Sequence, residues 1–277
     1  QGQYHLFFQY HPFSKKWGPM HWGHCTSEDF IKWEYLPCAL APEESYDEGG
    51  CYSGSAIEVD GEHVLIYTGI MDRYLDDGFH YYRKVQCIAK GDGIDYRKGE
   101  ENPIITGESL PEGSSLEDFR DPKVWREDDG YYLVVGSRAK DGSGQILMYY
   151  SEDLNQWEYV TVLEQSKNKY GKMWECPDFF SLGDRQILLV SPQDMRAKGL
   201  EFHNGNNSIF IYGQYEKESH QFKREKVTSA DYGLDFYAAQ TLLTQDGRRI
   251  LIGWMQSWDA NITPASFQWS GMMTIPR

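Results

Sequence analysis

Five short apolar segments, rich in β-branched and aromatic residues, recur along the chain at intervals of about 60 residues. Each follows a turn signal, and four of these signals are Asp-Gly or Gly-Asp dipeptides. Asp-Gly between apolar runs is a strong indication of a β-hairpin. The five segments are Tyr4–Tyr10, His63–Thr68, Tyr131–Gly136, Gln186–Ser191 and Arg249–Trp254. A series of hairpins at this spacing restricts the chain to repetitive all-β architectures.

A further strand precedes the turn in four of the five units, whereas the first unit has no such strand. These preceding strands are predicted over Tyr52–Val59, Arg120–Arg126, Trp174–Leu182 and Phe236–Thr244. A second repeated element is visible in Ser27–Tyr35 and Ser151–Tyr159, which are identical at six of nine positions. Five units of several antiparallel strands predict a five-bladed β-propeller, with a generic β-sandwich as the alternative.

The first and last units lack strands that the other units have. The first unit has no innermost strand, so we expect the chain to begin inside a blade. Residues 267–277 are predicted to be a third strand of the last unit, so the chain is also expected to end inside a blade. We therefore interpret residues 1–277 as one incomplete five-bladed propeller domain.

The charge of the chain excludes several classes of partner. Its net charge of -15 and isoelectric point near 4.9 repel nucleic acid and anionic membranes, which bind clustered Lys and Arg side chains. No apolar run approaches the roughly 20 residues of a membrane-spanning helix. A neutral small molecule fits this surface best, and the sequence leaves the oligomeric state open.

The five cysteines indicate neither a zinc site nor a disulfide framework, because they are odd in number and form no Cys-x-x-Cys pair. Reduced, buried thiols are the simplest interpretation, and they favour a cytoplasmic location. The chain does not begin with Met, so a targeting segment upstream would not be visible.

Carboxylates stand at the predicted starts of three innermost strands. A propeller brings such positions to one point, so Asp121, Glu175 and Asp235 are expected to be neighbours. Glu175 lies between bulky apolar residues, which favour the protonated form of a carboxyl group and make Glu175 a candidate general acid. The alternatives are a strand cap facing water for Glu175 and a strand-edge ion pair for Asp121 in its Arg-Asp-Pro segment.

Two or three carboxylates without metal-ligand spacing suit glycoside hydrolysis, in which one acid protonates the leaving oxygen and a second group attacks. No metal and no cofactor are implied. Gln9 and Trp17 are expected to bind sugar through an amide and an aromatic face, although packing is an equal alternative for Trp17. His24 is interpreted as a core or turn residue.

At this point the sequence resembles glycoside hydrolase family 32, the β-fructofuranosidases that include invertase, sucrose-6-phosphate hydrolase, levanase and inulinase. The resemblance covers almost the whole chain. It is carried by the combination of His5-Leu-Phe-Phe-Gln-Tyr10, Trp17-Gly-Pro-Met-His-Trp-Gly-His24, Tyr52-Ser-Gly-Ser-Ala56, Phe119-Arg-Asp-Pro122, Trp174-Glu-Cys-Pro177, Asp235-Phe-Tyr237 and Gly253-Trp-Met255.

The resemblance implies retaining hydrolysis of terminal β-D-fructofuranosyl bonds. By the same resemblance Glu175 is the acid/base, and Asp121, beside Arg120, holds fructose hydroxyls and stabilises the transition state. The residues that match substrate-pocket positions are Gln9, Trp17, Tyr52, Ser53, Arg120, Tyr237 and Trp258. Tyr52 stands where the family more often has Phe.

The nucleophile is the main departure from the family. Its Trp-Met-Asn-Asp-Pro-Asn-Gly segment does not occur in residues 1–277, and neither does a C-terminal β-sandwich. We therefore expect this chain alone to be inactive. The alternatives are a non-catalytic fructan-binding propeller and another five-bladed glycosidase, such as an arabinan hydrolase.

The preferred fructoside stays open among sucrose, sucrose 6-phosphate and fructo-oligosaccharides. Arg73, Arg196 and Lys198 are candidate phosphate-binding groups, with simple surface charge as the alternative for Arg196 and Lys198.

Overall fold

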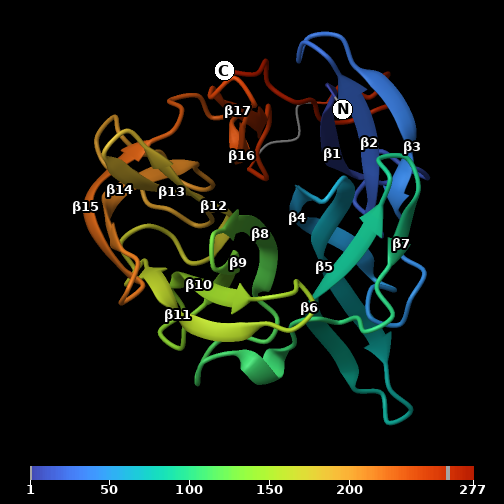
Figure 1. The fold of residues 1–277 in the computed structure, drawn as a ribbon, viewed down its shortest axis with the longest axis horizontal. Coiled ribbons are helices and arrows are strands. Elements are labelled where there is room, and N and C mark those ends of the chain that lie inside the picture. The colour runs from blue at the N-terminus through green and yellow to red at the C-terminus, as the bar shows by residue number, and fades with distance from the viewer. Residues whose placement is uncertain (1, 260–262) are drawn as a thin grey trace. The chain divides into compact units, whose positions relative to one another are not determined.

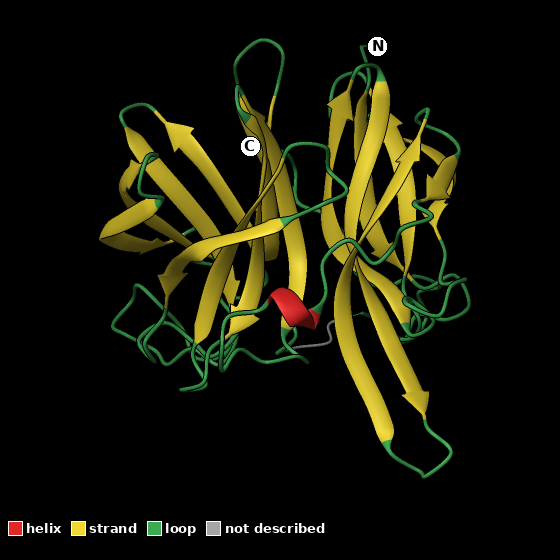
Figure 2. Ribbon diagram, turned by 60° about the horizontal axis from the view of Figure 1, so that its bottom comes forward, coloured by secondary structure: helices red, strands yellow, loops and turns green. Residues whose placement is uncertain are grey.

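The computed structural model describes residues 2–259 and 263–277. In these residues the chain forms seventeen β-strands and a single short 3-10 helix, Gly107–Ser109 (Figures 1 and 2). The fold class is therefore all-β, as predicted.

The strands form five sheets, and within each sheet every strand pairs with its neighbour in the sequence. The first sheet contains β1 (Tyr4–Tyr10), β2 (His21–Ser27) and β3 (Glu34–Leu40). The second contains β4 (Gly50–Val59), β5 (Glu62–Tyr74), β6 (His80–Gly91) and β7 (Tyr96–Lys98). The third contains β8 (Phe119–Glu127), β9 (Gly130–Arg138), β10 (Gly144–Ser151) and β11 (Glu158–Gln165). The fourth contains β12 (Trp174–Leu182), β13 (Arg185–Pro192), β14 (Ile209–Glu216) and β15 (Gln221–Ser229), and the last contains β16 (Tyr237–Leu243) and β17 (Arg249–Trp254).

Four of these sheets are blades of the β-propeller class, because they are meanders of three or four strands. The prediction of five blades is wrong in number, since β16 and β17 form only a two-stranded sheet. Residues 272–277 do run beside β17, with backbone hydrogen bonds from Thr274 to Gly253 (2.9 Å) and from Arg277 to Leu251 (3.1 Å). Pro276 lacks an N–H group, which helps to explain why this segment does not continue as a regular strand.

The chain forms two compact units whose segments alternate along the sequence. Unit 1 consists of Gln1–Leu110, Phe119–Tyr132 and Tyr150–Glu158. Unit 2 consists of Pro111–Asp118, Leu133–Tyr149 and Tyr159–Arg277.

In unit 1 the buried carboxylate of Asp47 contacts Tyr67 of the apolar core. Asp47 is fully buried and lies 2.6 Å from the ammonium group of Lys98. It also accepts hydrogen bonds from the Tyr67 hydroxyl (2.8 Å) and from the backbone N–H of Glu43 and Glu44. The partners satisfy a charge that would otherwise be costly to bury.

The first copy of the nine-residue repeat is a self-contained turn before β3. Asp29 Oδ1 accepts the backbone N–H groups of Ile31 and Lys32, each at 2.8 Å. The Trp33 indole donates to the Phe30 carbonyl oxygen at 3.2 Å, and Phe30 has a positive φ of 61°.

The second copy, before β11, repeats the same contacts. Asp153 Oδ1 accepts the N–H groups of Asn155 and Gln156, each at 2.9 Å. The Trp157 indole donates to the Leu154 carbonyl oxygen at 2.9 Å, and Leu154 has a φ of 70°. Asp and Trp, two of the six residues that the copies share, therefore make the same turn contacts in both.

The cysteines and the surface agree in part with the sequence-based expectations. All five cysteines are unpaired and four are buried, but Cys38 is exposed, so the prediction of buried thiols is wrong for Cys38.

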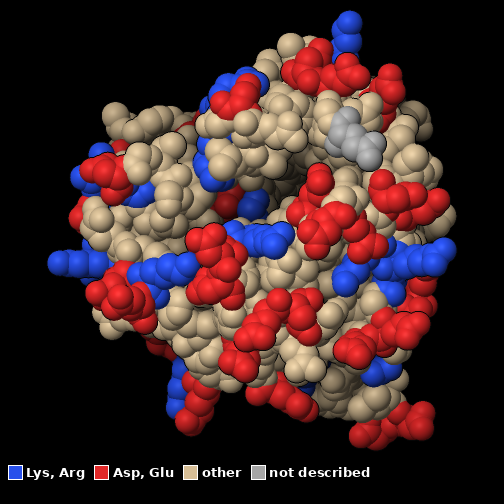
Figure 3. All heavy atoms as spheres, in the orientation of Figure 1, with Lys and Arg blue, Asp and Glu red and all other residues tan. Residues whose placement is uncertain are grey.

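Acidic side chains are spread over the face drawn in Figure 3, with basic ones between them. Across the described residues, no helix is both long and apolar enough to cross a membrane.

Three histidines of unit 1, one each on β1, β2 and β5, pack together. His5 Nδ1 lies 2.9 Å from His24 Nε2, and the His5 and His63 rings meet edge to face at 4.5 Å. His24 is only 1% exposed, which confirms that it is a core residue. Burial, and then the neighbouring histidines, lower the pKa of His5 and of His24 to about 4. Burial also lowers the pKa of His63, against the opposing effect of Glu58.

Acid is expected to destabilise unit 1 through these histidines. Between pH 6.5 and about 4 the unfolded chain binds protons that the buried imidazoles do not, so the free energy of unfolding falls as the pH falls. Urea midpoints at pH 7 and pH 4.5 measure this loss, which should be smaller for His24→Phe than for the wild type. His21→Gln, outside the cluster, serves as the control, and an equal loss in His24→Phe and the wild type would contradict the assignment.

Candidate active site

The innermost strands β4, β12 and β16 each carry a β-bulge near their N-terminal end. The pairing register shifts between Tyr52 and Gly54 in β4. It shifts between Glu175 and Asp178 in β12, and between Tyr237 and Gln240 in β16. A bulge re-aims the side chains beside it, and bulges are frequent next to active sites. In each strand the residue just before the shift is one that the sequence predicted to be functional.

Three residues within the innermost strands have the left-handed backbone conformation although none is glycine. Their φ angles are 68° for Asp121, 48° for Cys176 and 53° for Ala238. Each follows a predicted site residue in the chain. Such a conformation costs of order 1 to 3 kcal/mol and is concentrated at functional sites. The strain supports the choice of these strand starts as the site.

In unit 1, a buried chain of hydrogen bonds holds the start of β8. The Asp121 N–H donates to Thr68 Oγ1 at 2.9 Å, and the Thr68 hydroxyl donates to Gln86 Oε1 at 2.9 Å. The Gln86 amide in turn donates to the Phe119 carbonyl oxygen at 3.1 Å. Asp121 and Arg120 are both buried at this place. Sequence reasoning missed Thr68 and Gln86, which carry no signal beyond their place in or beside apolar runs.

Ser55 makes a second connection between β4 and β8. Its hydroxyl donates to the Pro122 carbonyl oxygen and accepts from the Val124 N–H, each at 2.9 Å. The Tyr-Ser-Gly-Ser segment thus contributes to positioning the Arg-Asp-Pro segment.

Gln9, Trp17 and Tyr52 are brought to the same part of unit 1. The Gln9 amide donates to the Cys51 carbonyl oxygen at 3.1 Å. The Trp17 ring meets the Tyr52 ring edge to face at 5.4 Å, and Trp17 is half exposed. Burial raises the pKa of Tyr52, while the Arg120 charge acts in the opposite direction. Ser53, the extra residue of the bulge, is half-buried.

In unit 2, the structure brings Glu175 and Tyr237 into direct contact. The Tyr237 hydroxyl lies 2.6 Å from Glu175 Oε2 and 2.9 Å from the Ser191 carbonyl oxygen. Tyr237 is 1% exposed, and the flanks of Glu175, Trp174 and Cys176, are buried. Glu175 is itself half-buried, so it is not a strand cap facing water.

The remaining predicted residues of unit 2, Asp235 and Trp258, lie just before β16 and just after β17. Asp235 lies in the bend before β16, and it is Tyr237, two residues later, that reaches Glu175. Trp258 is half exposed just after β17, with its ring 5.0 Å from that of Trp254.

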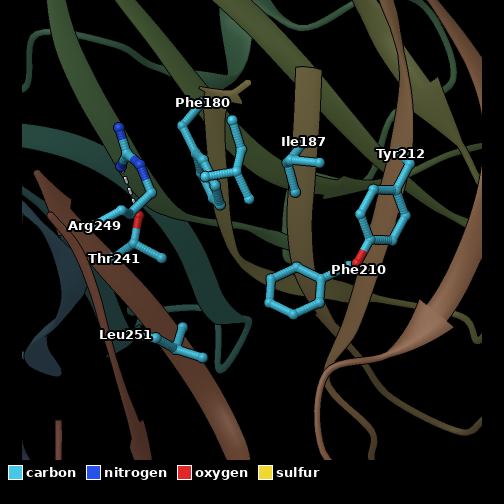
Figure 4. Close-up of a pocket in the computed structure, with 8 residues that line it drawn as sticks. Phe180, Ile187, Phe210, Tyr212, Thr241, Arg249 and Leu251 are labelled. Atoms are coloured by element: carbon cyan, nitrogen blue, oxygen red, sulfur yellow. Dashed lines mark hydrogen bonds between the residues drawn. The ribbon is translucent and has the colours of Figure 1, made fainter. Parts of the chain in front are cut away.

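Two cavities of unit 2 lie away from Glu175. The first, of about 150 Å³, lies toward the other end of β12 and is mostly apolar (Figure 4). There the Arg249 guanidinium lies 4.3 Å over the Phe180 ring and donates to Thr241 Oγ1 at 2.8 Å. The second, of about 340 Å³, lies beside the loop 197–204. Neither of these two cavities is lined by a predicted site residue.

The groups proposed for phosphate binding occur in both units, Arg73 in unit 1 and Arg196 and Lys198 in unit 2. Arg73 lies 3.8 Å from Glu48 and stacks on Tyr81. Arg196 and Lys198 are exposed, which fits the alternative of surface charge.

Comparison with known proteins assigns the family. Residues 1–277 match the domain described as "Glycosyl hydrolases family 32 N-terminal domain". The chain belongs to glycosyl hydrolase family 32. It is 44% identical to a sucrose-6-phosphate hydrolase of Escherichia coli, over 99% of this chain and 56% of that protein. It is 43% identical to a raffinose invertase of Escherichia coli, over 100% of this chain and 57% of that protein.

Solved structures of this family have the same fold. A β-fructofuranosidase of Bombyx mori matches with a TM-score of 0.90 and 40% identity, over 100% of this chain and 57% of that chain. A sucrose-6-phosphate hydrolase from Lactobacillus gasseri matches with a TM-score of 0.87 and 30% identity, over 99% and 56%. The chain thus spans a little more than half the length of the family 32 relatives that it matches.

The strained position after Tyr237 can be tested through stability. Glycine adopts a positive φ without strain, whereas a β-branched residue there is a conformational outlier. Ala238→Gly is therefore expected to be more stable than Ala238→Val by about 2 kcal/mol or more in urea unfolding. Ala56, exposed in β4, is the matched control, because valine is favoured over glycine in a regular strand. The same order of stability at both positions would contradict the assigned backbone strain.

Proposed function

We propose that the polypeptide containing this chain hydrolyses terminal β-D-fructofuranosyl bonds with retention of configuration. The substrates are sucrose, sucrose 6-phosphate or short fructo-oligosaccharides. The observation that carries the proposal is the half-buried Glu175 carboxyl group, which a 2.6 Å hydrogen bond from Tyr237 holds in place. The names of the family relatives, sucrose-6-phosphate hydrolase and raffinose invertase, support the same substrate class.

Glu175 acts first as general acid and then as general base. Its proton passes to the glycosidic oxygen as the bond to the fructosyl carbon breaks, and the leaving sugar departs as an alcohol. A carboxylate nucleophile forms the fructosyl ester, and Glu175 then removes a proton from the water that attacks it. Residues 1–277 contain no Asn-Asp-Pro-Asn segment, so we assign that nucleophile to no residue of this chain.

Asp121 and its neighbours are proposed to bind the fructosyl unit. Asp121 accepts hydrogen bonds from sugar hydroxyls, which strengthen as positive charge develops on the ring, and Arg120 helps to orient Asp121. The Thr68 contact to the Asp121 backbone supports this role, because it fixes the strand that carries the carboxylate. The remaining proposed substrate-binding residues are Gln9, Trp17, Tyr52, Ser53, Tyr237 and Trp258.

Residues 1–277 are proposed to act as a catalytic domain. The five unpaired cysteines support a cytoplasmic location.

The stereochemistry of the product tests the proposed function. Sucrose is incubated with the active polypeptide in the presence of methanol, and the first fructoside product is identified by NMR. Retention predicts methyl β-D-fructofuranoside, since methanol attacks the ester from the face that the leaving group occupied. An α-fructoside as first product, or no hydrolysis of any fructoside, would contradict the proposal.

Glu175→Gln tests the acid assignment. Glutamine keeps the shape but has no proton to give, so kcat for sucrose is expected to fall about 10²- to 10⁴-fold while sucrose still binds. Glu164→Gln, in the same unit on the outer strand β11, is the control and should keep wild-type turnover. A kcat for Glu175→Gln within a few fold of the wild type would exclude Glu175 as the acid.

A further inference from the structure

The hairpin of β5 and β6 continues beyond the part of its sheet that pairs with β4. The β4–β5 ladder ends at the pair Gly50 and Ile70, whereas β5 and β6 stay paired as far as Tyr74 and His80. Residues 71–74 and 80–83 therefore form a two-stranded extension, drawn in teal in Figure 1 and projecting from its sheet in Figure 2. A two-stranded hairpin is marginally stable by itself in water, so contacts between side chains must support it.

One face of this extension carries a row of rings. Tyr74 lies opposite His80 and Asp72 opposite Tyr82, so these four side chains share a face. The Tyr74 ring stacks on the His80 ring, with the centroids 4.7 Å apart and the planes at 17°. The His80 and Tyr82 rings follow at 6.0 Å.

The row is continuous with two of the proposed sugar-binding residues. A side-chain hydrogen bond joins Tyr82 to Tyr52, and the Tyr52 ring meets the Trp17 ring edge to face at 5.4 Å. All of these residues belong to unit 1. Aromatic side chains therefore lead without a break from the residues proposed to bind sugar to the end of the hairpin.

Tyr74 and Asp72 have the properties of a sugar-binding pair. Tyr74 is 75% exposed although one face of its ring lies on His80, so the other face is open to solvent. The C–H groups of a sugar ring pack well on the negative face of an aromatic ring. Asp72 Oδ1 lies 2.6 Å from His80 Nε2, and a carboxylate that makes this contact still has acceptor capacity for sugar hydroxyls.

We propose that this face, which we call the hairpin platform and which consists of Asp72, Tyr74, His80 and Tyr82, binds the leaving side of a fructo-oligosaccharide. It holds sugar units beyond those present in sucrose, since each step of two residues along the strands adds about 7 Å to the row. The inference rests on the proposed fructoside hydrolysis and deepens it, because it names oligosaccharides longer than a disaccharide as preferred substrates.

The charge of the chain favours a sugar over a second copy of the protein as the occupant. Two chains of net charge -15 repel each other, whereas a neutral sugar meets no such cost. The opposite face of the hairpin is also different in kind, because the Arg73 and Arg83 guanidinium groups lie over the Tyr81 ring at 5.4 and 5.1 Å. The open ring of Tyr74 is on the platform face.

Tyr74→Thr tests the platform, because threonine removes the ring and is favoured in strands. The assay compares kcat/KM for nystose, a fructo-oligosaccharide of four sugar units, with kcat/KM for sucrose. The nystose-to-sucrose ratio is expected to fall at least about fivefold, mainly through KM for nystose, which corresponds to roughly 40 Å² of buried apolar surface. Tyr74→Phe keeps the ring and should keep the ratio. Tyr35→Thr removes an equally exposed ring from β3 and is the matched control, with both substrates unchanged.

Each other outcome has a distinct meaning. An unchanged ratio in Tyr74→Thr would overturn the inference, and so would an equal loss on both substrates with a lower urea midpoint, which would mark a cross-strand pair that only supports the hairpin. A change in oligomeric state by sedimentation, with the ratio unchanged, would assign the face to a second copy and overturn the inference as well. Absence of fructoside hydrolysis by the wild type would refute the proposed function and this inference with it.

Discussion

The candidate site depends on non-glycine residues that adopt the left-handed backbone conformation, with positive φ, inside β-strands. This conformation occurs at Cys176 and Ala238 within bulges, and at Asp121 beside Arg120. A regular strand would alternate its side chains between the two faces, whereas the bulge breaks that alternation at the strand start. In β12 the strain is compensated by the regular ladder from Asp178 to Leu182, which pairs with β13 and holds the bulge in register.

The two units support their functional side chains in different ways. In unit 1 the support is polar and indirect, because Thr68 and Gln86 hold the backbone of β8. In unit 2 it is direct, because Tyr237 contacts the Glu175 carboxyl group itself. A group that must bind hydroxyls benefits from a fixed backbone, whereas a group that exchanges a proton also needs its side chain held in the productive orientation.

Much of the fold could be predicted from the sequence, because its signals are local. The five apolar runs are β1, β5, β9, β13 and β17, and the strands predicted before four of them are also present. The number of blades was wrong, because periodicity marks the hairpin of β16 and β17 but not whether residues 272–277 complete a regular third strand. At the site, the segment around Glu175 was recognisable, while its contact with Tyr237 depends on a register shift that has no sequence signature. Cys38 illustrates the same limit, since hydrophobicity predicts burial only on average.

The consecutive strand order has a consequence for how the protein is made. Every sheet is assembled from one continuous stretch of chain, so each strand finds its partner across a short loop. Contacts between near neighbours in sequence form faster than distant ones, because less chain entropy is lost in closing the loop. The turns closed by Asp29 and Asp153 need no help from elsewhere in the chain. A ribosome that has released one sheet has therefore already released all the strands that this sheet needs, and folding can follow synthesis from the first sheet to the last.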